Sequence, residues 1–224
     1  MVGLLSRWVS QAAMSRIRIR VCKGSETLMS SDLIHELKRK AVHLTSIIIV
    51  LVYLAFGQQT ILLLLTVYLI AILEIEYFRI EWGKKLPLVH SLLREKEADR
   101  LGGHVFFVMG CIIAISVFPE EITSAAILMT TFGDASAAIF GKAFGRTWIP
   151  GLTNRAVEGC AAEFIVDVVI GAIFLSNWIV VLVMAGTATV VETLANKMDD
   201  NLLIPLFSGF NGNLVLLASA YFNL

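Results

Sequence analysis

Residues 122–146 read ITSAAILMTTFGDASAAIFGKAFGR, an apolar run that carries one acid, Asp134, and two cations, Lys142 and Arg146. Read as a helix, these three residues lie along one face, because they are spaced by multiples of four. An acid inside a membrane-spanning segment is costly, so Asp134 is a candidate functional residue. An intramembrane acid that leads to a cationic end suggests chemistry on a phosphate at a membrane surface.

A parallel line of small residues lies beside that face, at Gly133, Ala137, Gly141 and Gly145. Small side chains at this spacing let another backbone, or a bulky polyanion, come close. The same faces would permit tight helix contacts in a homo-oligomer.

The composition of the 224-residue chain is that of a membrane protein. Hydrophobic residues make up 57% of it and charged residues 16%, and its mean hydropathy is +0.80. These values lie far from those of an ordinary soluble domain. The formal net charge is zero and by itself says nothing about partners; we expect none that is a nucleic acid.

The hydropathy pattern predicts an all-α, polytopic integral membrane protein with about seven transmembrane helices. Several apolar runs are shorter than the ~20 residues of an untilted span, so each is extended into its polar flanks. The runs occupy about 44–56, 61–73, 105–118, 122–140, 160–175, 178–195 and 202–222.

The charges alternate between the connections. All 18 Lys and Arg residues lie in the N-terminal segment, in 79–100, in 142–155 and at 197, whereas 57–59, 119–121 and 176–177 have none. The positive-inside rule therefore predicts a cytosolic N-terminus and a C-terminus outside. We expect a basic interfacial or flexible arm over 1–30 and a single transmembrane catalytic domain over 31–224. Its membrane would be the plasma membrane or the endoplasmic reticulum.

The first polar cluster, before the first span, consists of Glu36, Arg39, Lys40 and His43, which share one helical face. That face could present cations to a phosphate, or it could be a basic stop that sets the orientation of the span. A second cluster over 93–104 has mixed charges, typical of a solvated amphipathic helix. Arg100 and His104 lie nearest the membrane and are the exceptions.

A third cluster follows the opening run. Arg155, together with Lys142 and Arg146, gives three cations within fourteen residues, which suits a triphosphate. Glu158 opens the next span and could cap its helix or hold a magnesium ion shared with Asp134.

The fifth span carries two further acids. Glu163 and Asp167 lie four residues apart, on one face. Buried acids on a span are seldom structural.

The fourth cluster stands before the last span. Glu192, Asn196 and Asp199 would face the same way over two helical turns, with Asp200 and Asn201 in the turn that follows. Magnesium takes oxygen ligands, usually one or two carboxylates with substrate phosphate oxygens. An ordinary turn would explain one Asp and the Asn but not three acids, so the cluster predicts a functional site.

In this order, the motifs resemble the CTP-dependent polyprenol kinases: dolichol kinase, phytol kinase and the related CTP-dependent diacylglycerol kinase. The resemblance covers residues 36–210. The matching motifs are Glu36-x-x-Arg39-Lys40-x-x-His43, Gly133-Asp134-Ala135-x-Ala137-Ala138-x-x-Gly141-x-x-x-Gly145, Glu158-Gly159, and Glu192 with Asp199-Asp200-Asn201-x-x-x-Pro205.

Two features of the motifs refine the resemblance. The Gly-Asp-x-x-Ala motif is shared with phosphatidate cytidylyltransferases, whereas the Asp-Asp-Asn-x-x-x-Pro ending favours a kinase. The family usually has Lys-Thr or Lys-Ser shortly before Glu-Gly, and this chain has Arg155-Ala156. The charge is kept there and the hydroxyl is lost.

The resemblance implies transfer of the γ-phosphate of CTP to the hydroxyl of a long-chain lipid alcohol at the cytosolic membrane face, with Mg²⁺. The products are a lipid phosphate and CDP. It implies catalytic roles for Asp134, Asp199 and Glu192, and Mg²⁺ ligands among Asp134, Glu158, Asp199 and Asp200. The residues expected to bind the nucleotide are Lys40, His43, Gly133, Gly141, Lys142, Gly145, Arg146, Arg155 and Asn201.

Three alternatives stay open. The nearest is cytidylyl transfer from CTP to a lipid phosphate, with release of pyrophosphate. A proton-coupled transporter also uses intramembrane acids, although it predicts a related pair of broken helices. The third is a non-catalytic member of the family.

Overall fold

The computed structural model describes residues 46–82, 100–152, 155–195 and 198–222, all within one compact unit, Val42–Leu224. Helices make up most of this part of the chain, which contains no strand. One isolated antiparallel bridge joins Trp148 to Ala156. The expected boundary at residue 31 lies outside the described residues.

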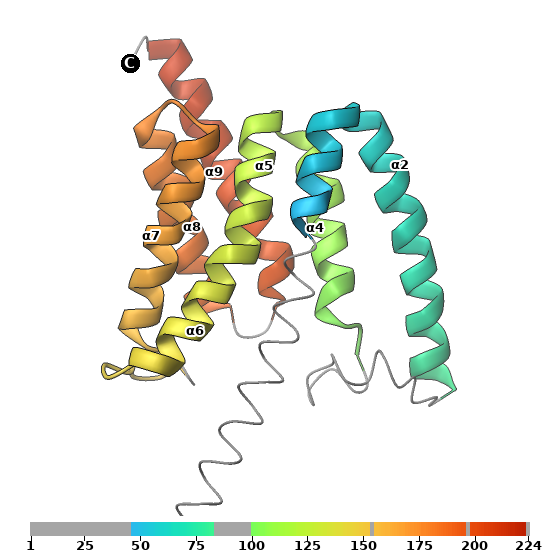
Figure 1. Cartoon of the computed structure of the whole chain (residues 1–224), viewed down its shortest axis with the longest axis horizontal. Coiled ribbons are helices and arrows are strands. Elements are labelled where there is room, and N and C mark those ends of the chain that lie inside the picture. The colour runs from blue at the N-terminus through green and yellow to red at the C-terminus, as the bar shows by residue number, and fades with distance from the viewer. Residues whose placement is uncertain (1–45, 83–99, 153–154, 196–197, 223–224) are drawn as a thin grey trace, which may run out of the picture. The chain divides into compact units, whose positions relative to one another are not determined.

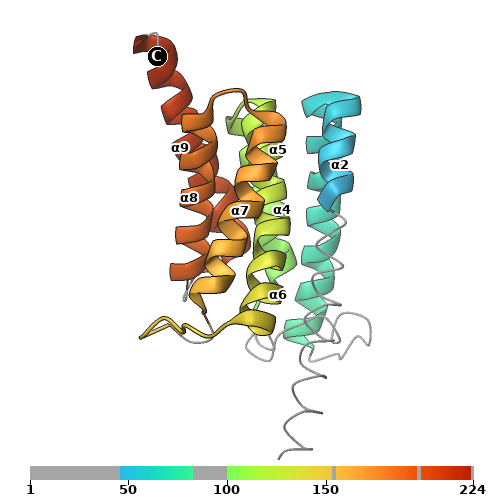
Figure 2. The same ribbon diagram turned by 60° about the vertical axis from the view of Figure 1, so that its left-hand side comes forward.

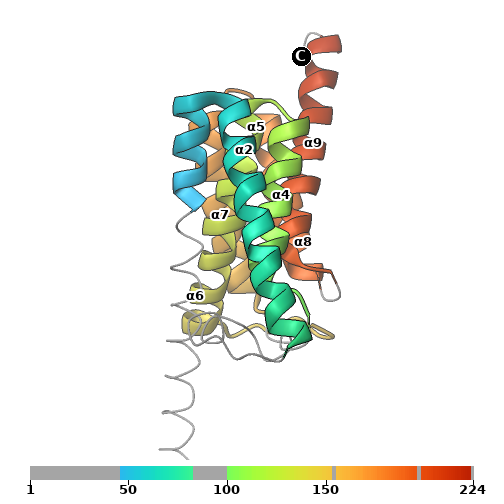
Figure 3. The ribbon, with the colours of Figure 1, turned by 90° about the vertical axis from the view of Figure 1, so that its right-hand side faces the viewer.

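Helix α2, Ser46–Glu81, is folded back on itself at Gly57, as Figures 1 and 3 show. Gly57 has φ 79° and ψ 175°, a conformation that glycine adopts without steric cost. The side chain of Gln58 donates to the Ile115 carbonyl at 2.8 Å, which ties this turn to α4, Gly103–Val117. The arms match the two predicted runs over 44–56 and 61–73, but the second continues to Glu81.

The opening run forms one continuous helical segment, as predicted. It consists of α5 (Glu120–Leu128), the π-helical turn η2 (Met129–Gly133) and α6 (Asp134–Phe144). One expectation is corrected: the helix ends at Phe144, with Gly145 extended at ψ 115°. Arg146 therefore lies beyond the helix and does not continue the face of Asp134.

The last three helices are α7 (Val157–Phe174), α8 (Trp178–Leu194) and α9 (Asp200–Phe222). Asn177 caps α8, where its side-chain oxygen accepts from the backbone N–H groups of Ile179 and Val180. Because α8 ends at Leu194, the prediction that Glu192 and Asp199 share a helical face is wrong. Asp200 begins α9 instead of lying in the turn.

The helices of the unit pack side by side. Helix α8 packs against α7 and α9, and α4 packs against α9 and α2 (Figure 2). The buried core between α5, α8 and α9 includes Ala126, Met129, Met184 and Ile204. Small residues on α5 let these helices approach closely, so the acid that follows them on α6 is held by a packed segment.

Three of the described helical segments are long and apolar enough to cross a membrane: Ser46–Glu81, Glu120–Phe144 and Asp200–Tyr221. Gly103–Val117 and Trp178–Leu194 are shorter apolar helices. Large apolar side chains stand exposed along α2, among them Leu51, Phe56 and Leu63. Since a soluble monomer rarely exposes so continuous an apolar surface, these helices indicate an integral membrane protein. The count of seven spans and the orientation of the termini stay predictions.

Candidate functional site

Four helix ends converge at one end of the described unit. The beginning of α7, the end of α8 and the beginning of α9 lie there together with α6, at the lower edge of Figures 1 and 2. Residues far apart in the sequence therefore meet here, although 66 residues separate Asp134 from Asp200.

Three buried acids from different helices meet at this end. Asp134 begins α6, Glu192 lies in the last turn of α8 and Asp200 begins α9. One carboxylate oxygen of each lies within 4.8 Å of one from each of the others. The side chains are nearly inaccessible, with 6%, 1% and 7% of the residue surface exposed. We call Asp134, Glu192 and Asp200 the acid trio.

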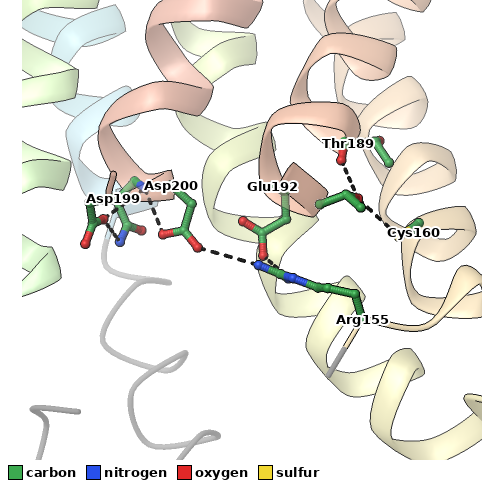
Figure 4. Close-up of polar contacts among 8 residues, drawn as sticks. Arg155, Cys160, Thr189, Glu192, Asp199 and Asp200 are labelled. Atoms are coloured by element: carbon green, nitrogen blue, oxygen red, sulfur yellow. Dashed lines mark hydrogen bonds and ion pairs between the residues drawn. The ribbon is translucent and has the colours of Figure 1, made fainter. Parts of the chain in front are cut away.

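Arg155, in the segment before α7, supplies a cation to the trio. Its guanidinium pairs with Glu192, and its Nη2 lies 3.9 Å from Oδ2 of Asp200, as Figure 4 shows. Burial by itself would lower the pKa of Arg155, but the carboxylates of Glu192, Asp134 and Asp200 outweigh it and raise the pKa. The arginine therefore stays charged and offsets part of the negative charge.

The trio has capacity for a second cation. Oε2 of Glu192 is buried and has no hydrogen-bond partner among the described residues. Three close carboxylates repel one another unless cations lie between them, and Arg155 supplies only one positive charge. An oxygen-only donor set of this kind suits a hard divalent cation.

Asp199 and Asn201 shape the turn that delivers Asp200. Oδ1 of Asp199 accepts from the backbone N–H of Asn201 at 3.1 Å and from its side-chain amide at 2.7 Å. This turn lies against α4, since a Cβ atom on Gly103 would stand 3.0 Å from Nδ2 of Asn201. Asp199 is thus a neighbour of the trio and not a member of it, and its catalytic and metal roles stay predictions.

Glu158 also lies outside the trio. Its carboxylate accepts from the backbone N–H of Thr147, at 3.0 Å from Oε1 and 3.3 Å from Oε2. Together with the bridge between Trp148 and Ala156, this contact closes the loop between α6 and α7. These contacts hold Glu158 to the loop, and its role as a metal ligand stays a prediction.

The predicted line of small residues contacts a neighbouring backbone. A Cβ atom on Gly159 of α7 would stand 2.7 Å from the carbonyl oxygen of Ala137 and 3.1 Å from Cα of Gly141. One on Gly145 would stand 2.9 Å from Cβ of Ala156. The line therefore packs α6 against α7. Nucleotide binding by Gly133, Gly141 and Gly145 stays a prediction.

Of the other predicted cations, two lie in the last turn of α6 or just beyond it, and two fall outside the described residues. Lys142 and Arg146 are exposed, in the last turn of α6 and just beyond it. Lys40 and His43, and with them the whole first cluster, fall in the part of the chain that is not described. Their expected contacts with phosphate stay predictions.

A second buried polar group, at the end of α2, escaped the sequence reasoning. Glu76 is fully buried and pairs with Arg79, with its Oε2 2.6 Å from Nη2. The same oxygen accepts from the backbone N–H of Gly102 at 3.2 Å, and Nε2 of His104 lies 3.8 Å from Oε1. Arg79 also donates to the Arg100 carbonyl. The i, i+3 spacing of Glu76 and Arg79 could have indicated an ion pair on one helical face, but both residues lie beyond the end of the apolar run at residue 73.

A hydroxyl and thiol contact joins α7 to α8 beside the site. Sγ of Cys160 lies 3.2 Å from Oγ1 of Thr193, which donates to the carbonyl of Thr189 at 2.7 Å (Figure 4). This contact lies one residue from Glu192 and helps to fix the end of α8.

The chain is similar to CTP-dependent lipid kinases, which confirms the expected resemblance. It is 25% identical over 142 residues to CTP-dependent diacylglycerol kinase 1 of Saccharomyces cerevisiae; the match covers 60% of this chain and 49% of the yeast protein. Against the protein of that name from Schizosaccharomyces pombe, the values are 26% over 140 residues, 60% and 64%. A probable chloroplastic phytol kinase of Triticum aestivum is 30% identical over 138 residues, with 53% of this chain and 46% of the plant protein covered.

The chain thus spans roughly half to two thirds of the length of these relatives. No protein-family model matches it. No solved structure matches it either.

Proposed function

We propose that the chain is a CTP-dependent lipid kinase, which transfers the γ-phosphate of CTP to the hydroxyl of a long-chain, polyprenol-type lipid alcohol. The observation that carries the proposal is the acid trio with Arg155, because it is built from the motif residues at one end of a membrane-type helix bundle. The names of the relatives, a CTP-dependent diacylglycerol kinase and a probable phytol kinase, support CTP as the donor and a lipid alcohol as the acceptor.

Phosphoryl transfer needs positioning and charge neutralisation more than covalent chemistry by the protein. Asp134, Glu192 and Asp200 would hold Mg²⁺, and their buried, oxygen-only donors suit it. Bound there, Mg²⁺ would offset the charge on the transferring phosphate. Arg155 keeps the trio together and presents its donors to phosphate oxygens, a task for which a guanidinium is well suited.

The position of the trio fits a reaction between a water-soluble donor and a membrane-bound acceptor. It lies where helices end, and apolar helical surface continues beyond it along α7 and α9, where Ile173 and Leu217 are exposed. The nucleotide would arrive at the charged helix ends, with Lys142 and Arg146 nearby in the chain. The alcohol would arrive along the apolar surface. We propose that the charged end faces the cytosol, as the distribution of Lys and Arg predicts.

Labelled CTP tests the proposal. Purified protein in lipid nanodiscs is incubated with Mg²⁺ and γ-labelled CTP, either with one of the alcohols diacylglycerol, phytol and dolichol or with phosphatidic acid as the lipid phosphate. A lipid kinase puts the label into the lipid and leaves CDP, whereas a cytidylyltransferase acting on a lipid phosphate releases it as pyrophosphate. If neither product forms and CTP with Mg²⁺ fails to raise the melting temperature, the proposal is wrong and the transporter alternative gains support.

A further inference from the structure

Asp167 is a fully buried acid for which the described residues offer no hydrogen bond. It lies on α7 with 0% of its surface exposed, and both Oδ1 and Oδ2 lack a partner there. A carboxylate without partners in an apolar interior is strongly unfavourable. In a membrane-type helix, such a residue is a functional candidate, and neither the trio nor Arg155 accounts for it.

The carboxylate of Asp167 lies directly against the π-helical turn. A Cβ atom on Gly133 would stand 2.5 Å from Oδ1 and 3.1 Å from Oδ2, so a larger residue there would force this carboxyl group to shift. The next residue, Asp134, belongs to the trio. Asp167 comes ten residues after Val157, about 15 Å along the helix. It therefore adjoins the trio on the side that leads into the bundle.

Glu163, one turn earlier on α7, is buried as well and lies on the same face of the helix as Asp167. Acids therefore continue from the trio towards Asp167. The only three-acid group that could hold a metal in the described part of the chain is the trio, and Asp167 is outside it. This favours a neutral hydrogen-bond donor over a divalent cation as the partner of Asp167.

We propose that Asp167 accepts a hydrogen bond from the hydroxyl of the lipid alcohol and so holds its oxygen beside the trio. This inference rests on the proposed function. An alcohol supplies one O–H donor on an apolar tail, which is the chemistry that a buried carboxylate with an apolar surround requires. On the same side of α7, the buried Ile170 belongs to the apolar core.

Matched ligands test this contact without catalysis. The probes are phytol and its O-methyl ether, which differ in the O–H donor. Binding is measured in nanodiscs without CTP, from the shift of the melting temperature with ligand concentration. A hydrogen bond to the buried carboxyl group should make the wild-type protein bind the alcohol about 10-fold more tightly than the ether. In Asp167→Leu the two should bind equally.

Two variants control the measurement. Glu74→Leu makes the same chemical change at an exposed position on α2 and should keep the wild-type preference. Asp167→Asn preserves the volume of the side chain and should lower the preference several-fold, which keeps the test available if Asp167→Leu does not fold. Without ligand, both Asp167 variants should melt at or above the wild-type temperature, because each removes a carboxylate without partners.

Three results would overturn the inference: no preference in the wild type, a preference that survives in both Asp167 variants, or lower melting temperatures with unchanged preference. Stabilisation of the lipid-free protein by Na⁺, K⁺ or Mg²⁺ that Asp167→Leu abolishes would assign the carboxylate to a cation instead. Failure of the proposed function is distinguishable, because it shows as wild-type protein that transfers no label from γ-labelled CTP.

Discussion

The guanidinium of Arg155, two residues before α7 begins, pairs with the carboxylate of Glu192, 37 residues later at the end of α8. Only 1% of the Glu192 side chain and 26% of the Arg155 side chain are exposed. The pair joins the segment before α7 to the end of α8 and places a positive charge within reach of Asp200. The negative charge of the trio is thus partly balanced by Arg155, which lies in the segment before α7 and not in one of the helices α6 to α9.

Arg155→Gln should destabilise the protein more than an ordinary surface change. Removing one partner of a buried pair leaves the other charge buried, and we expect a loss of about 3 kcal/mol, near the lower end for buried pairs because Arg155 is partly exposed. Thermal unfolding in mild detergent without divalent cations measures this loss.

Mn²⁺ should restore part of the stability of Arg155→Gln, because a divalent cation can offset the same carboxylates. Arg155→Lys is the control, since it keeps the positive charge and loses the planar guanidinium group. Its melting temperature should lie between those of the wild type and Arg155→Gln. A variant as stable as the wild type without metal would contradict this view of the pair.

Asp200→Asn should weaken the stabilisation by Mn²⁺ much more than Asp199→Asn does. Asp200 belongs to the trio, whereas Asp199 binds the backbone and amide of Asn201. We expect kinase activity to fall about 100-fold or more in Asp200→Asn, the size of effect seen when one electrostatic group of an active site is lost. Equal effects of the two substitutions on the Mn²⁺ titration would show that Asp199 is a ligand as well.

Glu76→Gln should destabilise the junction of α2 and α4. The carboxylate binds Arg79, the N–H of Gly102 and His104, and Arg79 itself is buried. Because neutral Gln leaves that cation without its charge partner, we expect a loss of about 3–5 kcal/mol. Glu74→Gln, two residues earlier and exposed, is the matched control. If both substitutions lower the melting temperature equally, the network is not what holds the junction.

Gly159→Ala should separate α7 from α6. The added methyl would stand 2.7 Å from the Ala137 carbonyl oxygen, a backbone atom that cannot move aside alone. We expect a lower melting temperature by several degrees, since overpacking typically costs about 1–3 kcal/mol.

Gly186→Ala, on α8, provides the contrast, because the nearest atom that the new methyl would meet is Cε2 of Phe164 on α7, at 4.0 Å. It should be neutral or stabilise the helix by up to about 1 kcal/mol. A destabilising effect at 186 as large as that at 159 would mean that close approach of the helices is not the cause.

Hydropathy predicted the helices well, because each apolar run became a helix with bounds close to those expected. The two arms of α2 even meet at the polar Gly57 connection. The distribution of charges predicted the helix ends less well. It placed Glu76 and Arg79 beyond the end of the apolar run, whereas in the structure they form an ion pair within α2, which continues to Glu81.

The candidate site could be predicted only as a set of residues. Asp134, Glu192, Asp200 and Arg155 were all expected to be functional, and the structure brings these four together. Sequence could not tell Asp200 from Asp199, because that choice depends on how the turn before α9 is hydrogen-bonded. Spacing likewise could not show that Glu158 reaches back to Thr147 across a loop.

The π-helical turn over Met129–Gly133 changes the rotation of α6 about the helix axis relative to α5. An α-helix rotates by about 100° per residue, and a π-turn takes up one extra residue within about one turn. Winding the same residues as a regular α-helix would therefore swing Asp134 away from Glu192 and Asp200, whereas deleting one residue from the turn would leave Asp134 near its present face. The extra residue lets α5 take the rotation that its packing requires while α6 takes the one that the acids require. Packing changes on α5 can then accumulate without moving the carboxylate, and chemistry on α6 can be altered without repacking the core.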